Sequence, residues 1–64
     1  MLSDWELWAC AGKLIELHGA DAAIHAAMRA DALMEEGDDA GAATFRRIVD
    51  RINRLQASPS GALN

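Results

Sequence analysis

The stretch FRRIVDRINRL, residues 45–55, decides the fold class. Its apolar side chains recur every three or four residues, and charged residues fill most of the positions between them. This spacing puts the apolar side chains on one face of an α-helix and the charged ones on the other face. The apolar face consists of Phe45, Ile48, Val49, Ile52 and Leu55. The stretch therefore predicts an amphipathic helix that buries one side.

Start and stop signals place two more helices before this one. We expect helices at about residues 4–18, 22–36 and 40–57. Ser3 and Glu6 have the spacing of a capping box at the start of the first helix, and Gly19 can supply the left-handed residue that ends it. Asp21 is expected to cap the second helix, and Gly37 to end it.

The third helix is expected to begin behind a cap at Asp38 or Asp39 and to close at Ser58-Pro59. Residues 58–64 then form a short disordered tail to a single domain of residues 1–57. Thr, Val and Ile are too few to give the alternation of a β-strand. The prediction is an all-α protein, a compact three-helix domain.

Size and composition exclude several classes of protein. The chain has 64 residues, so it makes one small domain, close to the lower limit at which a chain folds unaided. One cysteine excludes a disulfide framework and a four-cysteine metal site, and charges interrupt every long apolar run. A chain this small either packs its helices well or gains stability by association with another surface, so size alone leaves an oligomer open. Residues 1–4 have no positively charged start and Cys10 lies in an apolar helix, so we expect a cytoplasmic location.

The first helix has apolar side chains on two sides. We expect the core side to be Trp8, Ala11, Ile15 and His18, opposite a stripe of small residues on the second helix, Ala22, Ala26, Ala30 and Leu33. Two neighbouring helices cannot also cover the other side of the first helix. We therefore predict a homo-oligomer, most simply a dimer, or a complex with another protein. The predicted interface is Leu7, Cys10, Leu14, Leu17, Ile24 and Met28. The alternative is a monomer with an apolar surface. Trp5 would anchor a contact if its ring is exposed.

Charge is divided unevenly along the chain and leaves a second function open. The net charge is −7 over residues 1–39 and +3 over residues 40–64. The basic face of the third helix, Arg46, Arg47, Arg51 and Arg54, could contact phosphates as in a helix-turn-helix protein. Asp50 lies four residues from both Arg46 and Arg54, a spacing that favours salt bridges within the helix. Nucleic-acid binding is therefore the alternative to a protein-interaction module.

Catalytic and ligand-binding chemistry has little support in the sequence. Cys10 lies among apolar residues with no histidine in helical reach, which favours an inert thiol. His18 is placed to cap the end of the first helix, and His25 lies on a polar face of the second. A metal site would need these two histidines to converge with an acid across the turn. We expect no enzyme activity, no cofactor and no metal site.

An ordered set of residues across most of the chain resembles a known family. The set comprises Glu6-Leu7-Trp8-Ala9-Cys10-Ala11, His18-Gly19-Ala20-Asp21-Ala22, Arg29, Leu33, Gly37-Asp38, Gly41, Phe45, Ile48 and Leu55. It is similar to a family of short bacterial proteins that is classed as a domain of unknown function, over about residues 5–55. That family more often has Trp at Phe45 and larger aliphatic residues at Ala26 and Ala30. The resemblance implies no activity, cofactor or catalytic residue.

Overall fold

The chain is helical almost throughout, as the sequence predicted. The computed structural model describes the backbone of residues 2–63 and the side chains of residues 2–57. Its elements are α1 (Asp4–His18), a 3-10 turn η1 (Gly19–Asp21), α2 (Ala22–Glu35) and α3 (Asp39–Leu63). The backbone of α3 continues past the predicted end at Ser58-Pro59 to Leu63, and the side chains of the predicted tail, residues 58–64, lie outside the described ones. No helix of the described residues combines the length and the apolar character needed to cross a membrane.

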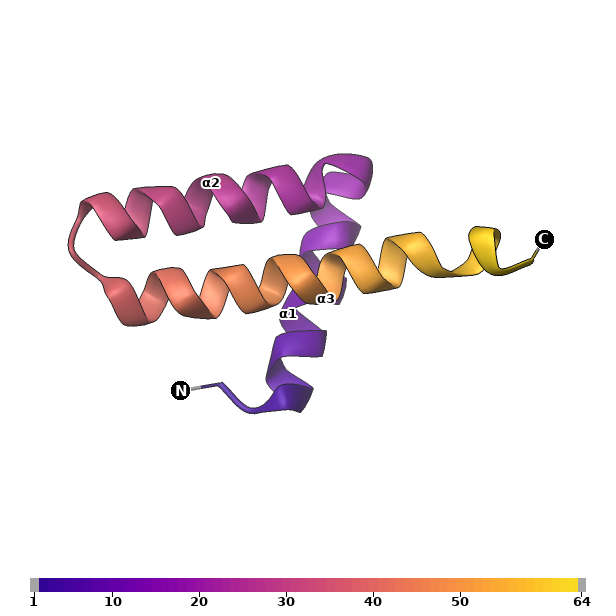
Figure 1. Cartoon of the computed structure of the whole chain (residues 1–64), viewed down its shortest axis with the longest axis horizontal. Helices are drawn as coiled ribbons and strands as arrows, with labels where there is room; N and C mark the ends of the chain where they lie inside the picture. The colour runs from indigo at the N-terminus through magenta and orange to yellow at the C-terminus, as the bar shows by residue number, and fades with distance from the viewer. Residues whose placement is uncertain (1, 64) are drawn as a thin grey trace.

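The predicted architecture, a compact three-helix domain, is wrong. Only two helices lie side by side: α2 and α3 form an antiparallel hairpin, and α1 runs across it instead of joining a bundle (Figure 1). α1 packs more extensively on α3 than on α2, so the expectation that the first helix lies along the small-residue stripe of the second is also wrong. The reason is that α3 packs along the buried stripe of small residues on α2 and covers it. α1 therefore packs across the pair near the start of α2.

The stripe of small residues on α2 faces inward, as predicted. Ala22, Ala26, Ala30 and Leu33 are all buried. Because alanine side chains are short, α3 can approach α2 closely and bury Ile48 and Ile52 against it. Phe45 and Val49 pack beside this core and are half-buried, whereas Leu55 is largely exposed. The hairpin is thus a close-packed pair of helices.

The face that α1 turns to the core overlaps the predicted one but is rotated: Ala11 is buried and Ile15 packs against the core as predicted, and Leu7 takes the place of Trp8. Leu7 and Ala11 are buried in the same cluster as Ile48 and Ile52, whereas Trp8 is only half-buried. The prediction assumed that α1 lies alongside α2. Because α1 instead crosses α3, the contact is made by the face centred on Leu7 and Ala11. The side of α1 that was predicted to face a partner therefore supplies part of the core.

Most of the predicted helix-end signals act as expected, including Gly37, which has a positive φ of 85° just after the end of α2. The Ser3 hydroxyl accepts from the Glu6 N–H at 3.2 Å and the Glu6 carboxylate accepts from the Ser3 N–H at 2.8 Å, which completes the capping box. Gly19 has a positive φ of 59°. Asp38 caps α3 by accepting from the Gly41 N–H at 2.9 Å. Asp21 makes no side-chain cap to α2, because η1 intervenes and alters the entry to that helix.

Candidate functional site

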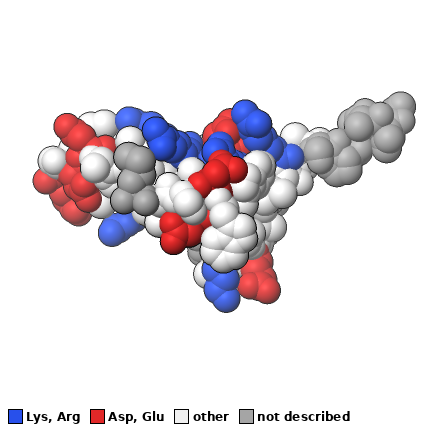
Figure 2. Space-filling model, turned by 90° about the horizontal axis from the view of Figure 1, so that it is seen from below, with Lys and Arg blue, Asp and Glu red and all other residues white. Residues whose placement is uncertain are grey.

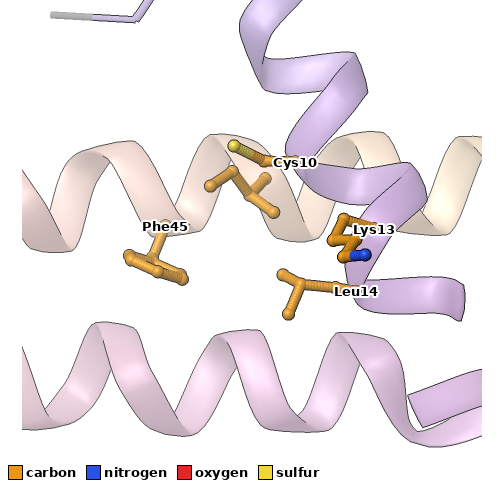
Figure 3. A pocket seen from close by; sticks show the side chains of 5 residues that line it. Cys10, Lys13, Leu14 and Phe45 are labelled. Carbon is orange, nitrogen blue, oxygen red and sulfur yellow. The ribbon is translucent and has the colours of Figure 1, made fainter. Parts of the chain in front are cut away.

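An open apolar groove lies between α1 and α3. Its volume is about 250 Å³, and its lining residues are Cys10, Lys13, Leu14, Phe45 and Ile48. Figure 3 shows Cys10 and Leu14 projecting from α1, and Phe45 from α3, toward the space between the helices. The groove exists because α1 crosses α3 at its middle and leaves Leu14 and Phe45 only partly covered. Its volume falls below the 300–1,000 Å³ typical of small-molecule pockets, so it is sized for a side chain rather than a cofactor.

The predicted interface on α1 is divided between the core and this groove. Leu7 is 3% exposed and lies in the core, so it is not available to a partner. Cys10 and Leu14 pack against the core with one side and line the groove with the other. Leu17 is 63% exposed. Because it follows Leu14 by three residues, Leu17 continues the same face of α1 beyond the groove.

The predicted contribution from α2 is exposed but lies on a separate face. Ile24 and Met28 are each 60% exposed. They are displaced around α2 from the buried stripe of Ala22 and Ala26, so they point away from α3. The structure therefore does not unite them with the groove.

The two tryptophans of α1 have different environments. Trp8 is half-buried, its indole N–H donates to Asp4 Oδ2 at 3.1 Å, and the guanidinium of Arg51 lies 5.2 Å from its ring centroid. Trp5, in contrast, is 75% exposed. An exposed tryptophan offers a large apolar area that loses little conformational entropy on binding. Among the described residues Trp5 is the most exposed large apolar side chain, so it is the side chain best placed to anchor a contact.

Arg51 ties the start of α1 to the middle of α3. Its guanidinium donates to Asp4 Oδ1 at 2.6 Å and to Asp50 Oδ2 at 2.9 Å. The side chain of Arg51 is 19% exposed, and its Nε is buried with no hydrogen-bond partner among the described residues. The hydrogen bond from Arg51 lowers the pKa of Asp4, and the same contact raises the pKa of Arg51. This arginine acts as a structural residue that holds α1 in place.

The predicted basic face of α3 is therefore partly neutralised. Arg54 Nε lies 3.0 Å from Asp50 Oδ2, as the four-residue spacing predicted, whereas the other predicted partner of Asp50, Arg46, makes no salt bridge among the described residues. Arg51 is shared between two carboxylates. Arg46 and Arg47 are exposed. Figure 2 shows basic and acidic side chains side by side over the middle of the molecule, with acidic ones gathered at the end where α2 meets α3. A continuous basic surface for phosphates is not formed on this view of the molecule.

The two histidines meet across η1. Their rings stack with centroids 3.9 Å apart and an interplanar angle of 17°. His18 lies at the end of α1, as predicted. Its stacking on His25 also joins this end to the first turns of α2. Among the described residues no group of three or more histidine, cysteine or acidic side chains could hold a metal ion.

The chain was compared with known families, proteins and structures. The family model described as a family of unknown function, DUF6961, matches residues 3–60, which is most of the chain. The chain belongs to the DUF6961 family. No curated protein and no solved structure matches it. Membership of DUF6961 agrees with the resemblance found in the sequence and adds no activity.

Several residues of this DUF6961 protein's surface were not identified from the sequence. Lys13 lines the groove, which the sequence did not indicate, whereas Phe45 and Ile48 pack in or against the core as predicted and in addition line the groove. The contact of Arg51 with Asp4 joins residues 47 positions apart. No local pattern signals such a pair, whereas the four-residue spacing of Asp4 and Trp8 could have suggested their hydrogen bond.

Proposed function

We propose that this DUF6961 protein is a small helical protein-interaction module that associates with copies of itself through the groove side of α1. The observation that carries the proposal is the open apolar groove together with the exposed Leu17 that continues its α1 wall. A small chain has few apolar side chains to stabilise it, and covering the groove and Leu17 with a second copy would remove more apolar surface from water. The role is binding rather than catalysis.

The surface is small, so the association should be weak. Interfaces below about 1,200 Å² are typical of transient complexes. Concentrations of about 10 μM to 1 mM are therefore needed to populate the complex, because weak complexes have dissociation constants in this range. Light scattering with size-exclusion chromatography over that range should show a mass that rises with concentration above the 6.9 kDa of one chain.

Leu17→Glu tests the surface directly. A charge at this exposed position should abolish the rise in mass while helicity persists, because burying an unpaired carboxylate in an interface is costly. Ala43→Glu is the matched control: it adds the same charge at an exposed position of α3 and should leave the mass unchanged. Met28→Glu reports separately on the exposed face of α2. A parent chain that stays monomeric, or a Leu17→Glu chain that associates like the parent, would contradict the proposal.

The nucleic-acid alternative has weaker support, since two of its four arginines are paired with carboxylates. Arg46 and Arg47 are the side chains to vary, because Arg51 holds α1 in place. A gel shift at low salt that is lost in the double variant Arg46→Glu, Arg47→Glu would favour nucleic acid. Absence of a shift at low salt would remove this alternative.

A further inference from the structure

Trp5 and the groove are complementary in size and chemistry. The groove offers about 250 Å³ of open apolar space, and Trp5 is a large aromatic side chain that is 75% exposed. Tryptophan buries about 150–250 Å² when it is covered, and such anchors occur at the centres of interfaces. The groove thus has room for one ring of this kind.

A chain cannot fill its own groove with its own Trp5. At 100° per residue, Trp5 lies on nearly the opposite side of α1 from Leu14, nine residues later, and well away from Cys10. Because α1 is a continuous helix over Asp4–His18, the ring cannot fold back across it. A Trp5 ring that occupies the groove must therefore come from another molecule.

Charge favours a second copy as that occupant. Lys13 lines the groove, and its ammonium is only loosely held by Glu16, at 3.4 Å with both side chains mostly exposed. Glu6 follows Trp5 directly and is also exposed. A docked Trp5 would bring the acidic start of one α1 toward the ammonium on another, and complementary charge of this kind guides docking.

We propose that Trp5 of one copy docks in the groove formed by Cys10, Lys13, Leu14, Phe45 and Ile48 of a second copy. This inference rests on the proposed self-association and specifies its contact. Since Trp5 and the groove lie on opposite sides of α1, each copy has one donor surface and one acceptor surface. Such a head-to-tail contact adds further copies in a chain or a ring, whereas a two-fold contact stops at a dimer.

Trp5→Ala tests the donor surface. We expect it to weaken association at least tenfold, because truncation of a docked aromatic anchor has effects of this size. Trp5→Phe should keep most of the affinity, since it retains an aromatic ring. Met34→Ala removes another exposed large apolar side chain and should leave association unchanged.

Mixing two deficient variants tests the pairing itself. Trp5→Ala has a groove and no donor, and Leu14→Glu has a donor and a blocked groove. Each alone should remain monomeric, and an equimolar mixture should form a pair of about 14 kDa, twice the chain mass, which does not grow further. If circular dichroism shows that Leu14→Glu is unfolded, Lys13→Glu replaces it, because Lys13 is exposed and its reversal opposes the charge of Glu6.

Cys10 reports whether the ring reaches the groove. Alkylation of Cys10 should slow as the parent chain is concentrated, and it should not slow for Trp5→Ala, which has no ring to cover the groove. A parent chain that never associates would overturn this inference together with the proposed function. A parent whose mass stops at two chains, or a Trp5→Ala chain that associates like the parent, would overturn the inference and leave self-association standing.

Discussion

Replacing Leu7 by alanine separates the face of α1 that packs on the core from the face that meets solvent. Leu7 is 3% exposed and packs in a cluster that includes Ile48 and Ile52. Leu→Ala removes three carbons, which is about 2.4 kcal/mol of transfer free energy at about 0.8 kcal/mol per methylene. With the cavity left behind, the expected loss in the free energy of unfolding is about 3 kcal/mol. Leu17→Ala is the matched control, because it makes the same change in the same helix at 63% exposure.

Leu7→Ala should lower the free energy of unfolding at least three times as much as Leu17→Ala does. A side chain that is mostly exposed has little burial to lose, so Leu17→Ala should cost less than about 1 kcal/mol. A 64-residue domain has a total stability of about 3–10 kcal/mol, so Leu7→Ala removes a large part of it. At about 4–8 °C per kcal/mol, Leu7→Ala should lower Tm by about 12–24 °C.

Urea unfolding followed by circular dichroism measures both losses. The protein is kept dilute, so that association does not contribute to the stability of the parent. Helix propensity cancels between the variants, because each replaces leucine by alanine inside α1. Equal losses for the two positions, or a larger loss for Leu17→Ala, would refute the packing of α1 through its Leu7 face.

Three further predictions concern two helical glycines and the Arg51 contact. Gly12→Ala should raise stability by about 1 kcal/mol, because Gly12 lies inside α1 with open space around it. Gly41→Ala should raise stability less than Gly12→Ala, or lower it, in the same urea titration. The reason is that a Cβ at position 41 would come within 2.5 Å of the Asp38 carboxylate that caps α3. Equal gains for the two variants would show that this cap does not contribute to stability. Arg51 lowers the pKa of Asp4 in the folded chain, so the stabilisation is complete above the ordinary pKa of 3.8 and is lost as pH falls through the lowered value. Asp4→Asn should therefore flatten the fall in stability below pH 3.8, and an unchanged acid titration would argue against the contact.

The local features of the fold could be predicted because they depend on residues close in sequence. The capping box of Ser3 and Glu6 spans three residues, and the cap of Asp38 on α3 also spans three. The alanine stripe of α2 follows from its helical period, and every member is buried. The salt bridge between Asp50 and Arg54 follows from their four-residue spacing.

The candidate site could be predicted only in part, because it depends on how α1 crosses the hairpin. The sequence showed that α1 has apolar side chains on two sides, but both sides satisfied the helical period equally well. Leu7 was therefore assigned to an interface although it lies in the core, and Phe45 packs against the core as predicted but also lines the groove. Cys10 and Leu14 pack against the core and also line the groove, and the spacing of residues in a sequence cannot predict such a double role.

By itself the sequence determined the all-helical class, the positions at which α1 and α2 begin and the buried face of the hairpin, since local hydrogen bonds and side-chain periodicity fix these. Tertiary structure alone decided that two helices pair while α1 crosses them. That choice depends on which packing buries the most apolar surface over the whole chain, a sum over residues far apart in sequence. It also decided that Arg51 meets Asp4 and that a groove remains open beside Leu14.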